Sequence, residues 1–297
     1  MIINIRATNV NGEEFIFDNT NRLVNGLDLS GLQADLNFTE SSLGGSRYQN
    51  TRLRNRELTL ELQLRKNLQS EELSDLARQR AYTVFNPESN PIRFDFQTSN
   101  GENYYLTAYL NSAPTMPPDA SNDNSAFQSM LLQLTCLDPF IYQTQESKVE
   151  IANYEALFEF DLEIPEEGIE FERRVDSLFG IIEYTGNGQS GMTIRFIARG
   201  NVSNPSLINV NTGEQIKLYY DMQPGDVIII ETYRGQRSIR LQRGRINVNI
   251  FNSYSLTEST FLQLSPGTNI FRSTADVGEE LLEVSLEYRV RRIGLWV

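Results

Sequence analysis

Apolar and polar residues alternate with a period of two along most of the chain. The clearest run is Glu57–Leu64, in which four leucines share one face of an extended segment. Such alternation is typical of a half-buried antiparallel strand. The pattern predicts further strands at Ile92–Phe96, Tyr104–Leu110, Met130–Leu137, Phe158–Ile164, Met192–Ala198, Val227–Thr232, Ile246–Phe251 and Val284–Val290. We therefore expect a mainly β protein.

Turn signals separate these runs. Glycine follows a polar residue or proline in a set of dipeptides that favour tight turns. They are Asn11-Gly12, Asn100-Gly101, Thr212-Gly213, Pro224-Gly225 and Arg234-Gly235. Residues 112–124 contain three prolines and predict an extended polar loop or arm.

One segment, residues 70–81, has helical spacing instead. Ser70 is a suitable N-cap, and Glu71 and Glu72 occupy the first turn, where the helix dipole favours carboxylates. An apolar stripe would face the core, made of Leu73, Leu76, Ala77 and Ala81. The sequence thus predicts a single α-helix.

The 297 residues contain no histidine and one cysteine, Cys136. Serine and cysteine nucleophile systems that use histidine are excluded, as are histidine-ligated metals, a disulfide within the chain and a four-cysteine zinc site. We expect no catalytic residue, no metal and no cofactor. The length favours two domains, although one large β domain is also compatible with it.

The net charge of -13 disfavours binding to bare nucleic acid. Eleven acidic residues lie between residues 146 and 176, opposed by three basic ones. Of the 26 basic residues, 23 are arginine. Arginine is enriched at protein–protein interfaces, but a compositional bias of the genome would give the same ratio.

Three charged clusters each admit a functional and a structural interpretation. Arg52, Arg54 and Arg56 lie beside Arg47 and Tyr48, and we select these three arginines as a candidate subunit interface; the alternative is a solvated loop. A second group consists of Arg234, Arg237, Arg240, Arg243 and Arg245. Its functional interpretation is a hairpin that binds phosphate or a partner. The favoured interpretation is an exposed hairpin whose arginines balance the charge of the acidic stretch. The carboxylates of Glu159, Asp161 and Glu163 would suit Ca²⁺ or a glycosidase, but a solvated strand face is favoured.

The N-terminus lacks the apolar core of a targeting segment, and the longest aliphatic run is Val227–Ile230. We therefore expect no membrane insertion, and a protein that stays in the cytoplasm unless it leaves within a larger assembly.

Several segments in order resemble the distal tail proteins (Dit) of long-tailed phages that infect Gram-positive bacteria. In the first half, Gly26-Leu27 precedes the Arg54–Leu60 approach to the leucine strand, a single helix follows, and Asp138-Pro139-Phe140 is similar to the family's junction. The second half is similar to family motifs at Asn204–Glu214, Pro224–Thr232 and Leu262–Asn269. The resemblance covers nearly the whole chain.

This resemblance implies a β-sandwich or split-barrel domain with one helix at residues 1–139, which forms a hexameric ring continuing the tail tube. It implies a galectin-like β-sandwich at residues 140–297. The implied partners are other copies of the chain, the tail tube protein, a tail-associated lysin-like hub protein and a receptor-binding protein. The implied location is the virion tail tip, with assembly in the bacterial cytoplasm, in phage or prophage particles.

A second hypothesis is a carbohydrate-binding module or carboxylate-dependent glycosidase of a host-adhesion apparatus. The galectin-like fold does not by itself imply sugar binding, because galectin sugar sites use a histidine and a stacking tryptophan. This chain has no histidine, and its one tryptophan is Trp296.

Overall fold

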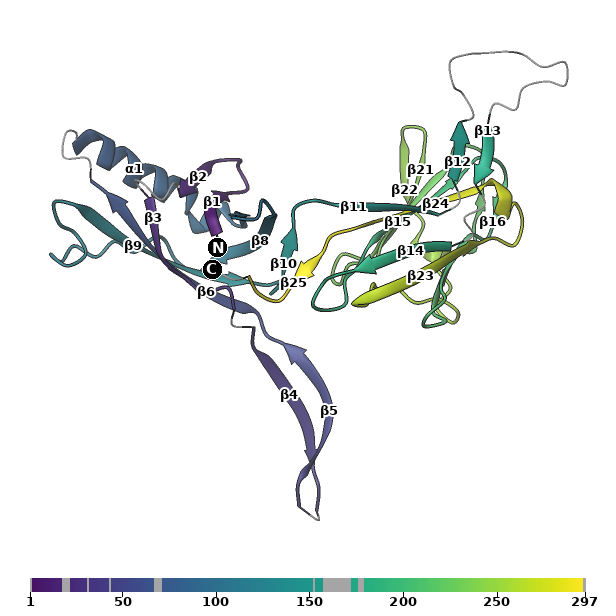
Figure 1. Ribbon diagram of the computed structural model, residues 1–297, viewed down its shortest axis with the longest axis horizontal. Helices are drawn as coiled ribbons and strands as arrows, with labels where there is room; N and C mark the ends of the chain where they lie inside the picture. Colours follow the sequence, from purple (N-terminus) through teal and green to yellow (C-terminus); the bar gives the residue numbers. More distant parts are fainter. Residues whose placement is uncertain are drawn as a thin grey trace. The chain divides into compact units, whose positions relative to one another are not determined.

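The chain forms two compact units in the computed structural model (Figure 1). The structure describes residues 2–17, 22–30, 32–42, 44–66, 71–151, 153–156, 172–175 and 179–295. Unit 1 comprises residues 1–145 together with 291–297, and unit 2 comprises residues 146–290. We expected a division at residues 139 and 140. The observed division differs because residues 141–143 and 291–292 pair within the sheet of unit 1.

Unit 1 contains one long antiparallel sheet, in the order β2-β1-β7-β8-β9-β6-β3, with β10 paired to β8 and β25. Its strands are β1 (Ile2–Thr8), β2 (Glu14–Phe17), β3 (Arg22–Leu27), β6 (Arg56–Arg65), β7 (Ile92–Thr98), β8 (Asn103–Leu110), β9 (Phe127–Cys136), β10 (Ile141–Gln143) and β25 (Arg291–Arg292). A separate hairpin consists of β4 (Ala34–Glu40) and β5 (Ser46–Leu53).

The sheet of unit 1 folds over its own core. Strand β8 meets β9 through only two pairs, Tyr109 with Thr135 and Leu110 with Leu134. The strands on either side of this short junction bury the alternate side chains that the period of two predicted, including Leu58, Leu60, Leu62 and Leu64. All belong to one hydrophobic cluster. The alternation of apolar and polar residues therefore correctly predicted which side chains of these strands are buried.

The helix α1 (Glu71–Val84) lies against this core, followed by the short 3-10 helix η1 (Pro87–Ser89). Ala81, Val84 and Phe85 are buried, but Leu76 is 54% exposed. The predicted apolar stripe is therefore wrong at Leu76, whose side chain faces solvent while Ala81 and Val84 contact the core. Ser70, the expected cap, and the side chain of Leu73 lie outside the described residues.

Residues 112–124 do not form a free arm. The backbone of Thr115 exchanges hydrogen bonds with Leu131 of β9, at 3.0 and 2.9 Å. Met116 packs against the core of unit 1. The loop therefore runs along the sheet.

Unit 2 is a sandwich of a six-stranded and a four-stranded antiparallel sheet. The larger sheet has the order β11 (Ser147–Ile151), β24 (Leu282–Tyr288), β15 (Thr193–Ala198), β20 (Val227–Glu231), β21 (Ser238–Arg243) and β22 (Ile246–Asn249). The smaller has the order β14 (Phe179–Tyr184), β23 (Gly267–Thr274), β17 (Ser206–Asn209) and β18 (Gln215–Lys217). The remaining elements are β12 (Asn153–Ala156), β13 (Glu172–Val175), β16 (Val202–Ser203), β19 (Asp221–Met222), η2 (Phe251–Ser253) and η3 (Glu279–Leu281).

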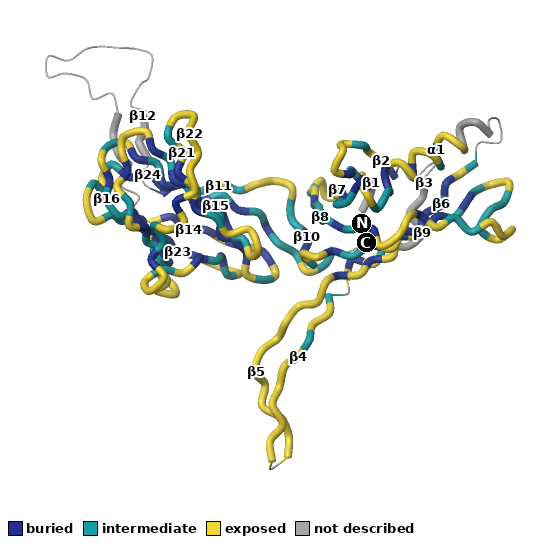
Figure 2. The backbone as a smooth tube through the Cα atoms, turned by 180° about the vertical axis from the view of Figure 1, so that it is seen from behind, coloured by how far each residue is buried: buried dark blue, intermediate teal, exposed yellow. Residues whose placement is uncertain are grey.

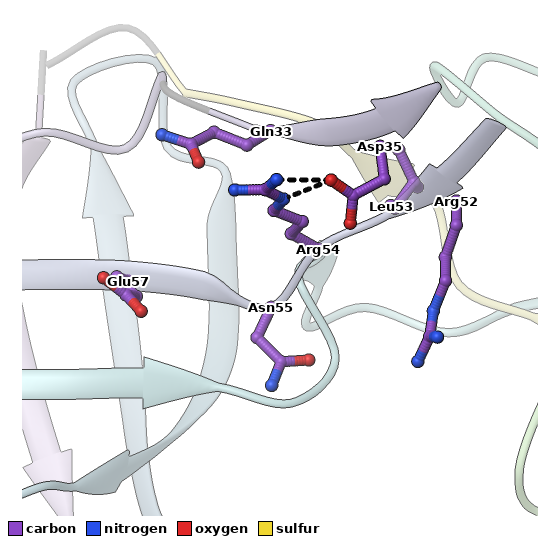
Figure 3. Close-up of a pocket in the computed structure, with 7 residues that line it drawn as sticks. All are labelled: Gln33, Asp35, Arg52, Leu53, Arg54, Asn55 and Glu57. Carbon is purple, nitrogen blue, oxygen red and sulfur yellow. Dashed lines mark hydrogen bonds and ion pairs between the residues drawn. The ribbon is translucent and has the colours of Figure 1, made fainter. Parts of the chain in front are cut away.

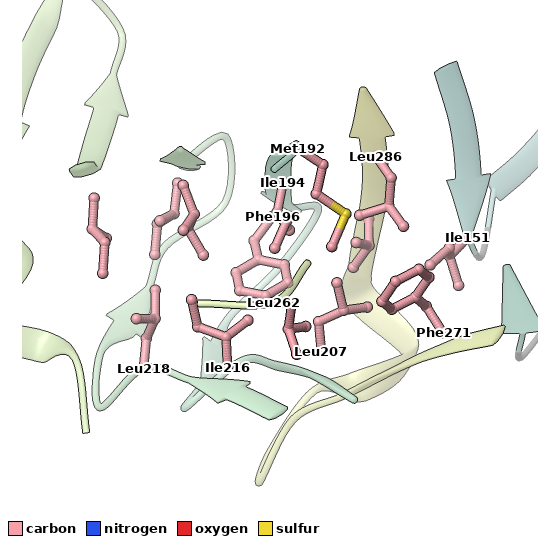
Figure 4. Packing of buried hydrophobic residues seen from close by; sticks show 14 of the residues in the cluster. Ile151, Met192, Ile194, Phe196, Leu207, Ile216, Leu218, Leu262, Phe271 and Leu286 are labelled. Carbon is pink, nitrogen blue, oxygen red and sulfur yellow. The ribbon is translucent and has the colours of Figure 1, made fainter. Parts of the chain in front are cut away.

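The inner faces of both sheets bury one hydrophobic cluster between them. Figure 4 shows Ile194 and Phe196 from the larger sheet facing Leu207, Ile216 and Phe271 from the smaller. The mainly β fold with a single α-helix in the described ranges confirms the expected fold class, and the two-sheet core is compatible with a galectin-like sandwich.

The glycine turns are also confirmed. Each expected turn glycine has a positive φ, between 72° and 87°, which residues with a Cβ rarely adopt; they are Gly12, Gly101, Gly213, Gly225 and Gly235. The expected strand at Ile246–Phe251 is shorter than predicted, since Phe251 begins η2. The expected strand at Phe158–Ile164, with its three carboxylates, lies outside the described residues.

Within the described part of the chain, no helix is both long and apolar enough to cross a membrane.

Candidate subunit interface

The most unusual feature of unit 1 is the hairpin of β4 and β5, which projects from the sheet of that unit (Figure 1). Gly44 and Gly45 lie in its turn, with φ of 92° and 81°. Only glycine adopts such angles without strain, so this pair allows the chain to reverse. A β-bulge follows Asn37, where the register shifts between Asn37 and Phe38. Bulges increase the local twist of a two-stranded ribbon.

The two faces of this hairpin differ in polarity. Phe38 is paired with Tyr48, Leu36 with Thr51 and Ala34 with Leu53. Paired residues share a face, so Leu36, Phe38, Tyr48 and Leu53 form one apolar surface, which we call the hairpin face. The opposite surface is polar and carries Asp35, Asn37, Arg47 and Arg52.

No described part of unit 1 covers the hairpin face. The exposed fractions are 61% for Leu36, 58% for Phe38, 61% for Tyr48 and 42% for Leu53. Figure 2 shows both strands exposed along almost their entire length. An isolated two-stranded hairpin is marginally stable in water, and clustered exposed apolar side chains mark interaction sites. The hairpin face therefore has the properties of a surface that a partner covers.

An ion pair closes the base of the hairpin. Arg54 donates from Nε to Oδ1 of Asp35 at 2.7 Å, and its Nη2 contacts the same oxygen. The hydrogen bond from Arg54 lowers the pKa of Asp35, and Asp35 in turn raises the pKa of Arg54. Both side chains are about half exposed, so the pair positions the strands more than it stabilises them.

A polar pocket of about 510 Å³ lies at this base (Figure 3). Gln33, Asp35, Arg52, Leu53, Arg54, Asn55 and Glu57 line it. The figure shows Arg52 turned away from the Asp35–Arg54 pair. Arg52 enters no ion pair within the described ranges, so its guanidinium is available to a neighbouring molecule.

The structure separates the three arginines that the sequence grouped together. Arg52 and Arg54 are exposed at the hairpin base, whereas Arg56 is only 2% exposed. Arg56 donates to the carbonyl oxygens of Pro139 and Leu29, each at 2.8 Å, and to that of Ile293. Burial lowers its pKa. Arg56 therefore joins three segments within unit 1 and has no surface to offer to a neighbour, which corrects its selection as an interface residue.

The apolar residues of the hairpin face were not singled out from the sequence, apart from Tyr48. The available signal was Gly44-Gly45 between two short runs of alternating polarity, a combination that predicts a hairpin.

No group of three histidine, cysteine or acidic side chains that could hold a metal occurs in the ranges described above. Glu159, Asp161 and Glu163 lie outside those ranges.

Comparisons with known proteins find similarity to phage tail components. Residues 185–291 match the family model of the siphovirus-type tail component, C-terminal domain. The crystal structure of the Dit protein (gp 19.1) of phage SPP1, described as a paradigm of the hub adsorption apparatus in phages that infect Gram-positive bacteria, has 13% sequence identity and a TM-score of 0.64. The match covers 96% of this chain and 98% of that one.

The baseplate of phage P2 in its activated conformation with Ca is more distant, with 10% identity, a TM-score of 0.48 and coverage of 97% of this chain and 98% of that one. No curated protein matches the chain. The expected resemblance is confirmed by the family domain in unit 2 and by the shared fold across nearly the full length. Residues 185–291 thus carry the C-terminal domain of the siphovirus-type tail component, and the chain as a whole has a fold similar to that of the SPP1 Dit protein.

Proposed function

We propose that this chain is a structural subunit of a phage tail tip, in which unit 1 closes into a hexameric ring that joins the tail tube to the baseplate and its host-adhesion device. The family domain in unit 2 and the Dit fold support this role. No enzymatic activity belongs to the proposal. Its partners would be the tail tube protein, a lysin-like hub protein and a receptor-binding protein, within the virion and after assembly in the host cytoplasm.

The observation that carries this proposal is the uncovered hairpin face. In a closed ring, each subunit presents one patch to a neighbour and receives a different patch from the other side. An apolar surface on a projecting hairpin suits the first role, because it reaches beyond its own subunit and gains stability only when a neighbour covers it. Arg52 and Arg54 at the hairpin base would lie at the rim of the same contact.

Solution mass tests this proposal directly. Light scattering of the full chain should give a mass near six times 33.9 kDa. The double variant Leu36→Ser/Phe38→Ser should be monomeric and should keep the circular dichroism spectrum of the folded wild type, because neither side chain is buried within the subunit. The control Val10→Ser/Val277→Ser alters side chains that are 61% and 63% exposed elsewhere and should assemble normally.

Two results would count against the proposal in different ways. If the hairpin variant assembles like the wild type, the ring uses another surface. If the wild type stays monomeric at high concentration, the ring itself is wrong, and glycan binding by that monomer would favour the carbohydrate-binding hypothesis.

A further inference from the structure

A second exposed surface, on unit 2, has different chemistry. Residues 233–257 contain five arginines and no acidic residue, in a chain whose net charge is -13. Arg243 is held by Asp226 through two hydrogen bonds of 2.6 Å, and Arg237 lies 4.9 Å from the ring centre of Phe261. Arg240 and Arg245 are exposed and enter no ion pair among the residues described. This segment is therefore locally basic, and the guanidinium groups of Arg240 and Arg245 are accessible to a partner.

In the described part of unit 2, the same segment forms an unpaired edge of the six-stranded sheet. Among the strands that the structure describes, β22 is the last in this sheet and pairs with β21 alone. Ile250 donates its N–H to the carbonyl of Ile239 at 3.0 Å, which marks this pair as hydrogen-bonded. Hydrogen-bonded pairs alternate along an antiparallel ladder, so Val248 and Ile246 also bond toward β21. The backbone N–H and C=O groups of Asn247 and Asn249 consequently point away from the sheet.

Apolar side chains lie beside this edge. Val248 is paired with the buried Leu241, so Val248 and Ile246 are on the inner face of the sheet, yet they are 45% and 62% exposed. The chain that follows exposes Phe251 by 39% and Leu256 by 86%. Short edge strands with charged side chains protect sheets against aggregation, but that protection gives no reason to expose aliphatic residues on the same strand.

We propose that β22 is a docking edge for an acidic, extended segment of another protein, which adds to the six-stranded sheet as a further strand. Main-chain bonds to Asn247 and Asn249 would hold the segment in register. Its carboxylates would face Arg245 at the turn and Arg240, which is paired with Asn249 on the outer face, while its alternate apolar residues would cover Val248 and Ile246. This surface is separate from the hairpin face and does not depend on the ring.

Fluorescence anisotropy with a labelled, end-blocked peptide of alternating glutamate and valine tests the proposal on the full chain. We expect saturable binding that weakens steeply between 50 mM and 500 mM salt, as charge-steered contacts do. A peptide of alternating lysine and valine should not bind. Absence of binding by the glutamate peptide at low salt would overturn the proposal.

Variants separate the edge from general charge attraction. Arg240→Ala/Arg245→Ala should weaken binding at least about fivefold at low salt. Asn247→Pro removes one outward N–H without breaking a bond to β21, and it should weaken binding similarly. Arg272→Ala removes a charge from an exposed site on the smaller sheet and should change binding less than twofold.

Three outcomes would contradict the docking edge. Equal weakening by Arg272→Ala would indicate attraction to the whole surface. Binding that is unchanged in the arginine variant would exclude the charge contacts, and this variant decides the question if Asn247→Pro fails to fold. Inorganic polyphosphate that binds as tightly as the peptide, together with full peptide binding by Asn247→Pro, would indicate a site for polyanions instead of a strand.

Discussion

Arg56 is a buried arginine whose hydrogen-bond acceptors in the structure are all main-chain carbonyls. Its three acceptors belong to Leu29, Pro139 and Ile293, which precede the hairpin, follow β9 and follow β25 respectively. The guanidinium has a rigid fork of donors that can satisfy several carbonyls at once, which a lysine cannot reproduce. The residue thereby fixes three segments that are remote in sequence.

Replacement of Arg56 should therefore destabilise unit 1. We expect Arg56→Met to lower its free energy of unfolding by about 3 kcal/mol, since three carbonyls lose their donor. Urea unfolding measures the change. Arg52→Met is the matched control on an exposed arginine and should stay within about 0.5 kcal/mol of the wild type. Equal effects of the two substitutions would refute the role given to Arg56.

Asp226 supplies a pH-dependent contribution to unit 2. Its carboxylate is almost fully buried, and the hydrogen bond from Arg243 is the main cause that lowers its pKa. A depressed folded-state pKa stabilises the fold above the unfolded value of about 3.9, and this contribution disappears as the pH falls below it. Asp226→Asn should therefore be less stable than the wild type at pH 6, and the difference should shrink toward pH 3.

Thermal unfolding of the wild type, Asp226→Asn and Asp221→Asn across that pH range checks this expectation. Asp221 is exposed, so its substitution makes the same charge change without a buried partner. A stability difference for Asp226→Asn that is constant from pH 6 to pH 3 would rule out the linkage.

At the scale of single elements, β6 shows what alternation can establish. Leu58, Leu60, Leu62 and Leu64 are at most 5% exposed, and β6 pairs with β9 over its full length and with β3 on its other side. Burial of this apolar face is sufficient to determine the position and register of the strand. Its position could be predicted from the sequence for that reason.

Leu60→Asp should unfold unit 1 and leave unit 2 intact. A charge buried in this core costs several kcal/mol, comparable with the whole stability of a domain. Limited proteolysis should then yield a resistant fragment that begins near residue 146 and ends near residue 290. Loss of both units together would show that they do not fold independently.

The hairpin of β4 and β5 could not be recognised in the same way, because burial within the chain does not determine it. Its apolar residues face solvent in the single chain, so no core selects their register. The assignment of Arg56 to the interface is wrong for the opposite reason, because contacts within the chain determine the position of its side chain. The regular spacing of Arg52, Arg54 and Arg56 suggested a shared surface, whereas Arg56 is buried and hydrogen-bonded to carbonyls up to 237 positions away, and sequence spacing carries no record of such contacts.

At the scale of the molecule, the chain leaves unit 1 before residue 146 and returns to it at residue 291. The returning residues pair with β10, place Leu295 against the core and supply the carbonyl of Ile293 to Arg56. Unit 1 is therefore incomplete until residues that follow unit 2 have been synthesised. The sequence division at residues 139 and 140 missed this return, since two short strands give no periodic signal.

A chain ending at Val290 should have a weakened unit 1 and an unchanged unit 2. Hydrogen exchange resolves the two, because each unit reports its own opening. We expect faster exchange in β6, β9 and β10, and wild-type protection in β15 and β20. Wild-type protection throughout the truncated chain would show that the return segment is dispensable.

Electron microscopy of the purified full-length protein shows whether unit 1 builds a closed ring. We expect class averages of rings with six subunits, in which the hairpin of each subunit lies against its neighbour. Isolated single subunits at every concentration, together with particles that contain the protein but no such ring, would contradict it.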